Sequence, residues 1–549
     1  MAADQQVGAP TVTVHGAART VTGSCYEIRC GGHAVLVDCG LFQGPRSLEA
    51  LNFEPFAFVP ARIDAVVLTH AHIDHSGLLP RLVANGYEGN IWCTAATGDL
   101  LAPMLADAGR IQEWAAERRN RRPDRRDQRP VDPIYTEADA VTAAMRGRAV
   151  ALESWFEPAP GFRARLWNAG HILGSASVEV EVGGVRLLFS GDIGPEWKSL
   201  HPDPSAPAGF DHVFCESTYG DRGRATVTAE ERRALLAAEV RDALDRGGNL
   251  VIPVFAVERT QELMLDLAVL LGRGALDRAS VFVDSPLASR VTGVFRHHAA
   301  ELEDVDGTGA FDRADFHFTD AAIESMRLND MSGAVIMAAS GMCEAGRIRH
   351  HLLHNLPRED STILFVGFQA AGTLGRTILD GAGWVRLSGR DVAVRARVRR
   401  IDSYSAHADQ GELLRWIEAR RPIAGGLFLT HGEEGAIHAL AELAKTAAPA
   451  VVAPRIGETW SLPKGRKPAL AGEGRADLGG VLSRDWQNDY ADFAANLKGR
   501  LVAIGDDGRR REAIAAMGRV LADWRSRHPN TRGPRRDRVG PGGGGALRA

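Results

Sequence analysis

The chain is poor in the features that would place it in a membrane, in an oxidising compartment or among zinc ribbons. Its 549 residues include only six cysteines, and no two of them form a C-x-x-C pair. No apolar run approaches the roughly 18 to 20 residues that a bilayer-spanning helix requires, and no basic-plus-apolar leader opens the sequence. These absences predict a soluble, cytoplasmic protein with reduced cysteines and no membrane partner.

The remaining composition is that of an ordinary globular protein. Apolar residues make up 45% and charged residues 24%, so most of the chain is expected to fold. At 549 residues it is too long for a single core, which predicts two or three domains. The net charge of −4 is small for this length and does not identify a partner.

Two styles of secondary structure alternate along the chain. From residue 11 to about residue 38, short alternating runs with glycine punctuation predict consecutive strands and tight turns. Strands and helices then alternate, as in an α/β layered domain. Between about residues 220 and 390 the order strand, helix, strand recurs, which is typical of a doubly wound parallel sheet. After residue 390 the first style returns.

The densest group of reactive side chains follows the apolar run DAVVLT at residues 64–69. Within six residues the chain carries His70, His72, Asp74 and His75. A single histidine after a strand is usually a hydrogen-bonded structural residue. Packing, however, gives no reason to place four ionisable side chains in one turn. Imidazole nitrogen and carboxylate oxygen suit zinc, so this turn predicts a metal site.

Three more candidate ligands stand just beyond other apolar runs. His171 follows RARLWNAG, Asp192 follows VRLLFSG, and His431 follows GGLFLT. The strands of an α/β layer deliver their C-terminal ends to one face. We therefore expect all seven side chains to meet there, and seven ligands suit two metal ions.

Several motifs resemble a known family. THAHIDHSG, LVDCG, AGHILGS and FSGDIG are similar, in order and rough spacing, to the metallo-β-lactamase fold. CESTYGDR, ASGMCEAGR, GFQAAGTLGR, YSAHAD and LTHGE resemble its β-CASP branch of nucleic-acid-processing nucleases. Within that branch the chain looks most like prokaryotic relatives of the endonuclease subunit of the cleavage and polyadenylation specificity factor. The resemblance extends over residues 11–463.

The resemblance implies an α/β fold: a four-layer αββα metallo-β-lactamase domain with an inserted, doubly wound α/β β-CASP domain. The expected domains are residues 1–218 and 392–463 for the two parts of the lactamase domain and 219–391 for the insertion. A helical extension (464–527) and an Arg/Gly-rich tail (528–549) that we expect to be disordered complete the chain. RNA would thread the cleft between the lactamase and β-CASP domains.

The same resemblance implies a ligand set for two Zn²⁺ ions. One ion would take His70, His72 and His171, and the other Asp74, His75 and His431. Asp192 would bridge the two ions. Asp38 resembles the buried acid that orients the cluster.

The resemblance also implies catalytic roles beyond the metal ligands. His407, in SYSAHAD, resembles the histidine that donates a proton to the leaving 3′ oxygen, and Glu216, in FCESTYG, resembles the acid that holds it. Asp74 belongs to the catalytic set as well. Ser405 and Arg376 are candidate substrate-binding residues. The competing interpretation is that His407 and Glu216 only brace the domain junction.

Together these features predict a zinc-dependent ribonuclease that hydrolyses phosphodiester bonds of single-stranded RNA as an endonuclease. Three alternatives stay open: a 5′-to-3′ exoribonuclease, a small-molecule metallo-hydrolase and a non-catalytic RNA-binding scaffold. GFQAAGTLGR lacks the G-x-x-x-x-G-K-[ST] order of a P-loop, which argues against a nucleotide triphosphatase.

Arginine-rich segments and the C-terminal region carry weaker signals. Seven arginines between Arg118 and Arg129 fit a solvated helix end and loop better than a phosphate-binding surface. The arginines of the tail could tether RNA or have no role. The helical stretch at about residues 484–527 has two open interpretations: it forms a homodimer or partner contact, or it packs on its own domain.

Overall fold

A computed structural model describes residues 8–121, 129–224, 227–276, 279–305, 309–367, 369, 372–478, 497, 501 and 503–527. The chain divides into two units, residues 1–486 and 487–549, which are treated separately below. In the second unit, the described part holds helix α15 (Asp507–Arg527). The Arg/Gly-rich tail and most of the loop after Arg121 lie outside the described residues. No helix in the described ranges is long and apolar enough to cross a membrane.

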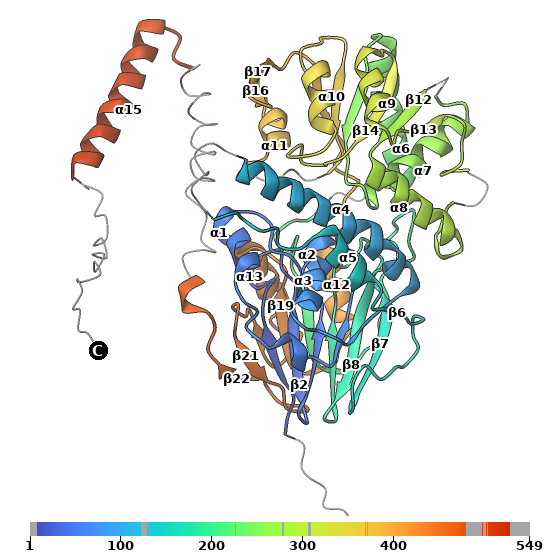
Figure 1. The fold of residues 1–549 in the computed structure, drawn as a ribbon, viewed down its shortest axis with the longest axis vertical. Helices are drawn as coiled ribbons and strands as arrows, with labels where there is room; N and C mark the ends of the chain where they lie inside the picture. The colour runs from blue at the N-terminus through green and yellow to red at the C-terminus, as the bar shows by residue number, and fades with distance from the viewer. Residues whose placement is uncertain are drawn as a thin grey trace, which may run out of the picture. The chain divides into compact units, whose positions relative to one another are not determined.

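Two mixed β-sheets form the lower layers of the first unit (Figure 1). The strands of the first sheet lie in the order β22 (Ala469–Gly472), β21 (Thr459–Ser461), β1 (Thr11–Val14), β2 (Tyr26–Cys30), β3 (His33–Val37), β4 (Ala65–Val67), β5 (Asn90–Cys93) and β6 (Gly147–Ala149). Those of the second lie in the order β20 (Val451–Val452), β19 (Ile423–Thr430), β10 (Phe210–Glu216), β9 (Val185–Phe189), β8 (Ala176–Val182) and β7 (Phe162–Asn168).

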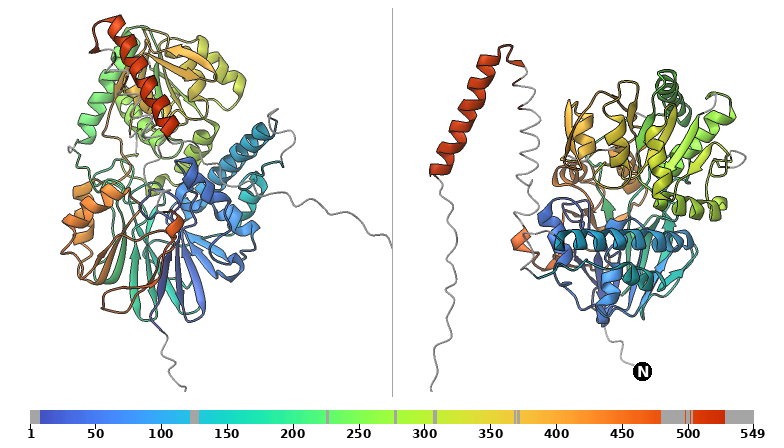
Figure 2. Two further views of the ribbon diagram at one scale, coloured as in Figure 1. Left: turned by 90° about the vertical axis from the view of Figure 1, so that its left-hand side faces the viewer. Right: turned by 45° about the horizontal axis from the view of Figure 1, so that its top comes forward.

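The two sheets pack face to face and are covered by helices on their outer faces (Figure 2). Val12, Val14 and Ile28 of the first sheet share one buried cluster with Val178 and Phe189 of the second. Burial alternates along β1 because successive side chains point to opposite faces of the sheet, so Val12 and Val14 lie in this core and the two threonines do not. The covering helices include α1 (Arg46–Glu49), α2 (Ile73–Ser76), α3 (Leu79–Ala84), α4 (Ala95–Asn120) and α5 (Glu137–Ala144) on one side, and α12 (Gln410–Glu418) and α13 (Glu434–Leu443) on the other.

A third, wholly parallel sheet forms the inserted domain. Its strands lie in the order β13 (Phe316–Phe318), β12 (Ser280–Asp284), β14 (Ala334–Ala338), β11 (Leu250–Pro253), β15 (Thr362–Phe365) and β18 (Arg397–Arg400), next to a hairpin of β16 (Trp384–Leu387) and β17 (Arg390–Ala393). Its helices are α6 (Ala229–Asp245), α7 (Arg259–Gly272), α8 (Pro286–His297), α9 (Ala322–Arg327), α10 (Ile348–Asn355) and α11 (Leu374–Leu379). The expected fold class is confirmed: an αββα domain with an inserted doubly wound domain.

Two strands lie outside the domain limits expected from the sequence. β18 follows residue 391 but pairs with β15, so the inserted sheet continues past that residue. β22 follows residue 463 and pairs with β21, so the first sheet continues into the expected helical extension. Each strand has only four residues, RVRR and ALAG, and so short a run does not indicate which sheet edge it will join.

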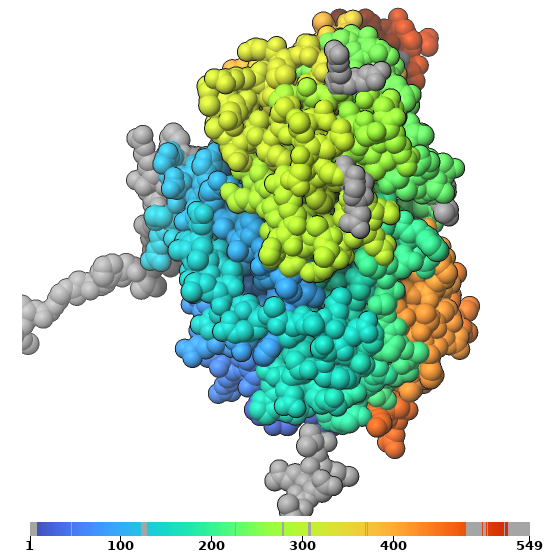
Figure 3. Space-filling model, turned by 90° about the vertical axis from the view of Figure 1, so that its right-hand side faces the viewer, coloured from blue at the N-terminus to red at the C-terminus, as the bar shows by residue number. Residues whose placement is uncertain are grey.

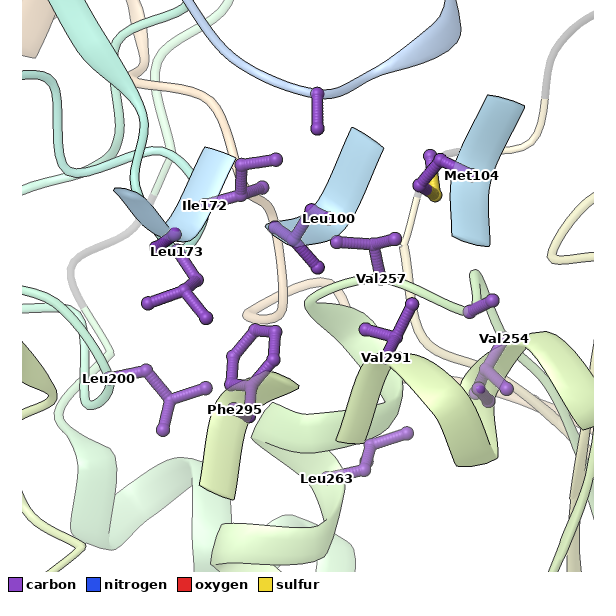
Figure 4. Packing of buried hydrophobic residues seen from close by; sticks show 14 of the residues in the cluster. Leu100, Met104, Ile172, Leu173, Leu200, Val254, Val257, Leu263, Val291 and Phe295 are labelled. Carbon is purple, nitrogen blue, oxygen red and sulfur yellow. The ribbon is translucent and has the colours of Figure 1, made fainter. Parts of the chain in front are cut away.

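One continuous apolar core joins the inserted domain to the lactamase domain (Figure 4). Phe295 of α8 points toward Leu173 and Leu200, and Val257 lies near Leu100 of α4. In the space-filling view, the yellow-green inserted domain meets the blue-to-cyan part of the chain directly (Figure 3). The two domains are therefore packed as parts of one unit, which fixes the groups at their junction relative to one another.

We expect Phe295→Ala to destabilise the first unit by about 3–5 kcal/mol, because it removes a fully buried ring and leaves a cavity at the domain junction. Leu443→Ala is the matched control, since Leu443 is 47% exposed and its truncation should change the unfolding free energy by less than about 0.5 kcal/mol. Chemical denaturation monitored by tryptophan fluorescence measures both. Equal stability of the two variants would contradict a shared core.

Candidate metal centre and catalytic pair

The seven expected metal ligands come from one edge of the two stacked sheets. His70 and His72 lie on the turn between β4 and α2, Asp74 and His75 lie within α2, and the other three follow β7, β9 and β19. β9, β10 and β19 run parallel to one another. β8 is antiparallel to both β7 and β9, so β7 runs in the same direction as β9. The C-terminal ends of these strands thus open at the same edge, where an α/β layer collects its functional groups.

The first group consists of three imidazoles and one carboxylate. His72 Nδ1 lies 3.1 Å from both His70 Nε2 and His171 Nε2. Asp192 Oδ2 lies 3.5 Å from the same two Nε2 atoms. Burial holds the pKa of His70, His72 and His171 below the ordinary value, so these rings are neutral and offer lone pairs. Nitrogen lone pairs facing one another at such distances suit a cation between them.

The second group adjoins the first through Asp192. His75 Nε2 and His431 Nε2 are 3.1 Å apart, and Asp74 Oδ2 lies 3.6 Å from His431 Nε2. Asp192 Oδ1 lies 3.2 Å from His75 Nε2. The two oxygens of one carboxylate therefore face two different groups of ligands.

The donor atoms fit a metal on a test that is independent of the family. Asp192 Oδ1 is buried, yet it accepts no hydrogen bond from any residue that the structure describes. A buried carboxylate oxygen that faces only imidazole nitrogens, here His75 Nε2 at 3.2 Å, is costly unless a positive charge neutralises it, and a metal ion bound by those nitrogens would supply one. Burial raises the pKa of Asp192, but His431 and His75 outweigh burial and hold it well below the ordinary value, so the carboxylate is charged.

Hydrogen bonds behind the ligands fix their rings. Asp38, in the left-handed region at φ 62°, accepts from His75 Nδ1 at 2.7 Å, from the Thr69 backbone N–H at 2.8 Å and from Ser24 Oγ at 3.0 Å. His171 Nδ1 lies 2.8 Å from the carbonyl oxygen of Ala406. A proton on Nδ1 leaves Nε2 of each ring as the ligand atom.

His407 and Glu216 meet at the junction of the two domains. Glu216 ends β10, after which the chain enters the inserted domain, and His407 precedes α12, where the chain has returned. His407 Nδ1 lies 3.3 Å from Glu216 Oε2, and the rings of His407 and His171 are 4.6 Å apart. The His407 side chain is 22% exposed whereas Glu216 is fully buried, so the imidazole is accessible and its acid is not. Burial lowers the pKa of His407, but Glu216 outweighs burial and raises it above its ordinary value.

The two candidate substrate-binding residues already have partners. Ser405 Oγ accepts from the His407 backbone N–H at 3.3 Å, which shapes the loop that carries His407. Arg376 pairs with Asp380 one turn further along α11, with a nitrogen-to-oxygen distance of 2.9 Å. In the arginine-rich segment, Arg118 stacks over the exposed Trp114 ring, with 5.3 Å from its guanidinium carbon to the ring centroid.

Some residues at the site were missed from the sequence. Lys198 Nζ donates to the His171 carbonyl oxygen at 2.7 Å and pairs with Glu258, a residue of the inserted domain. Thr218 Oγ1 lies 3.2 Å from His431 Nδ1. Lys198 follows Asp192 closely in the sequence, and this closeness could have indicated that it lies near the metal ligands. Ala406 acts through its backbone carbonyl, so the residue type gives no indication of this role.

This fold and this edge of histidines and aspartates define a metal-dependent hydrolase of the αββα type. Sequence profiles of three families match: the metallo-beta-lactamase superfamily over residues 18–245, the Beta-Casp domain over 260–378, and the Zn-dependent metallo-hydrolase RNA specificity domain over 391–454. The chain belongs to the β-CASP family of the metallo-β-lactamase superfamily. This confirms the family expected from the motifs.

Similar proteins agree with this assignment. Ribonuclease TTHA0252 of Thermus thermophilus is 37% identical over 451 residues, which cover 81% of this chain and 98% of that protein. Transcription termination factor FttA of Methanocaldococcus jannaschii is 30% identical over 438 residues, 77% of this chain and 67% of that protein. A crystal structure of a protein of unknown function from Enterococcus faecalis V583 shares the fold at 14% identity, with a TM-score of 0.50 over 82% of this chain and 99% of that one.

We expect His72→Ala to lower the zinc content of the purified protein, because His72 Nδ1 faces two other ligand nitrogens of the first group. His438→Ala is the control, since His438 is exposed on α13 and belongs to neither group. Atomic emission after dialysis against metal-free buffer measures both. Unchanged zinc in His72→Ala would remove this residue from the ligand set.

Proposed function

We propose that this chain is a two-zinc ribonuclease that hydrolyses phosphodiester bonds within single-stranded RNA. The observation that carries the proposal is the position of Asp192, whose two carboxylate oxygens face separate groups of ligands beside the His407–Glu216 pair. The profile of an RNA specificity domain over residues 391–454 supports RNA as the substrate, as does a 37% identical relative that is named a ribonuclease.

The distances between the donor atoms support two ligand sets. His70, His72 and His171 would hold one ion, Asp74, His75 and His431 the other, and Asp192 would bridge both. When bound, zinc supplies Lewis-acid chemistry: it activates water and stabilises negative charge on a phosphate. Asp38 fixes the ring of His75 in its ligand orientation, and the Ala406 carbonyl does the same for His171.

His407 is the proposed general acid. Glu216 Oε1 accepts the backbone N–H of Ile193 at 2.5 Å, so the acid that holds His407 is tied to the residue next to Asp192. With Nδ1 held by Glu216, Nε2 of the imidazolium is left to give its proton to the leaving 3′ oxygen. Glu216 raises the pKa of the His407 ring, which favours the protonated form that a general acid needs.

We expect His407→Ala to lower the cleavage rate by about 10²- to 10⁴-fold, the usual contribution of a general acid. Zinc content should stay at the level of the parent protein, because His407 is not one of the seven proposed ligands, although it lies near Asp192. Single-turnover cleavage of a labelled RNA and metal analysis of the same preparation provide the two values. A variant that cleaves at the parent rate would assign His407 a bracing role only.

Product mapping distinguishes cleavage within the strand from removal of its 5′ end. We expect the zinc-loaded protein to give internal fragments from a 5′-labelled single-stranded RNA, whether its 5′ terminus is free or blocked. Release of labelled mononucleotide only from the free terminus would make the enzyme a 5′-to-3′ exonuclease. Absence of any cleavage by the zinc-loaded protein, with the chelated protein as blank, would contradict the proposed function.

A further inference from the structure

A buried lysine lies between the first metal group and the inserted domain. Lys198, in the loop after β9, is 5% exposed. Its Nζ donates to the backbone carbonyl oxygen of His171 at 2.7 Å and lies 2.5 Å from Glu258 Oε1. Lys198 therefore joins the backbone of a proposed ligand to a carboxylate of the other domain.

Glu258 sits at the start of α7 in an unusual backbone conformation. Its φ of 71° and ψ of −63° form a γ-turn, closed by a 2.9 Å hydrogen bond from the Arg259 N–H to the Val257 carbonyl. A non-glycine residue in such a conformation costs on the order of 1–3 kcal/mol. The contacts of the side chain must offset that cost, because the residue is held there while 2% exposed.

A histidine completes the environment of this carboxylate. His201 Nε2 lies 2.8 Å from Glu258 Oε2 and 3.0 Å from Oε1. Burial raises the pKa of Glu258, but His201 and Lys198 outweigh burial and hold it well below its ordinary value. Glu258 is therefore a charged acceptor for Lys198.

The surroundings of this link are apolar. Ile172 and Leu173, which directly follow His171, lie in the same buried cluster as Leu200, Val257 and Phe295 (Figure 4). Lys198 and Glu258 are themselves buried, and removing one partner of a buried charge pair is strongly destabilising for the other.

From this geometry we propose that Glu258 is a positioning residue: through Lys198 it fixes the backbone of His171, and so the place of the His171 ring in the first metal group. The inserted domain thereby helps to assemble the metal site of the other domain. This inference rests on the proposed function only in taking His171 as a metal ligand, and its test needs no RNA.

The test is Glu258→Gln, which keeps the shape of the side chain and removes its charge. Zinc affinity, measured by chelator competition, should fall by about 10- to 100-fold at one site, the usual effect of losing a residue that orients a ligand. The visible spectrum of the cobalt(II)-substituted protein should shift, because the His171 ligand is displaced. A merely structural role for Glu258 would lower the melting temperature and leave that spectrum unchanged.

Glu262→Gln is the matched control. Glu262 is a buried carboxylate on α7 whose side chain pairs with Arg232 and Arg259 instead of Lys198. Both variants should lose stability, and only Glu258→Gln should change the zinc affinity and the cobalt spectrum. Equal zinc affinity and spectra in the two variants would overturn the proposal.

Lys198→Met tests the same link from its other end. It should weaken zinc binding as Glu258→Gln does, and adding Glu258→Gln to it should cause no further loss, because Glu258 acts through Lys198. Additive losses in the double variant would overturn the proposal. If one of the two single variants does not fold, the zinc affinity and cobalt spectrum of the other still test the proposal. A parent protein that binds zinc but leaves RNA intact would refute the ribonuclease proposal and leave this result untouched.

Discussion

The buried carboxylate of Asp192 is the constraint on which the site depends. It is charged, almost fully withdrawn from water, and its two oxygens point at two different groups of imidazoles. Burying such an anion is expensive; His431 and His75 offset part of the cost, whereas the neutral rings of His70 and His171 do little. The arrangement becomes favourable when cations lie between the carboxylate and the rings. This requirement explains why so many ligands converge on one edge of the sheets.

The inserted domain also determines where the proposed proton donor lies relative to the metal ligands. The chain leaves the αββα domain after Glu216 and returns before His407, so the crossing points themselves carry the proposed proton donor and its acid. The continuous apolar core around Phe295 then holds the inserted domain firmly against the loop of His171. The same junction therefore combines apolar packing with the buried hydrogen bond from Lys198 to the backbone of His171.

Much of the site could be predicted because its signal is local in sequence. The cluster from His70 to His75 lies within one turn, and each of the remaining ligands follows a strand whose end is visible as an apolar run. The Lys198–Glu258 link joins residues from different domains, so no local pattern records it. The strands β18 and β22 lie beyond the expected limits because a run of four residues does not specify its sheet.

The central claim is that Asp192 bridges two zinc ions. Anomalous diffraction at the zinc absorption edge, from crystals of the zinc-loaded protein, tests it most directly. The account predicts two peaks about 3.5 to 4 Å apart, one beside His70, His72 and His171 and the other beside Asp74, His75 and His431, with Asp192 between them. A single peak, or two peaks of which neither contacts Asp192, would contradict it.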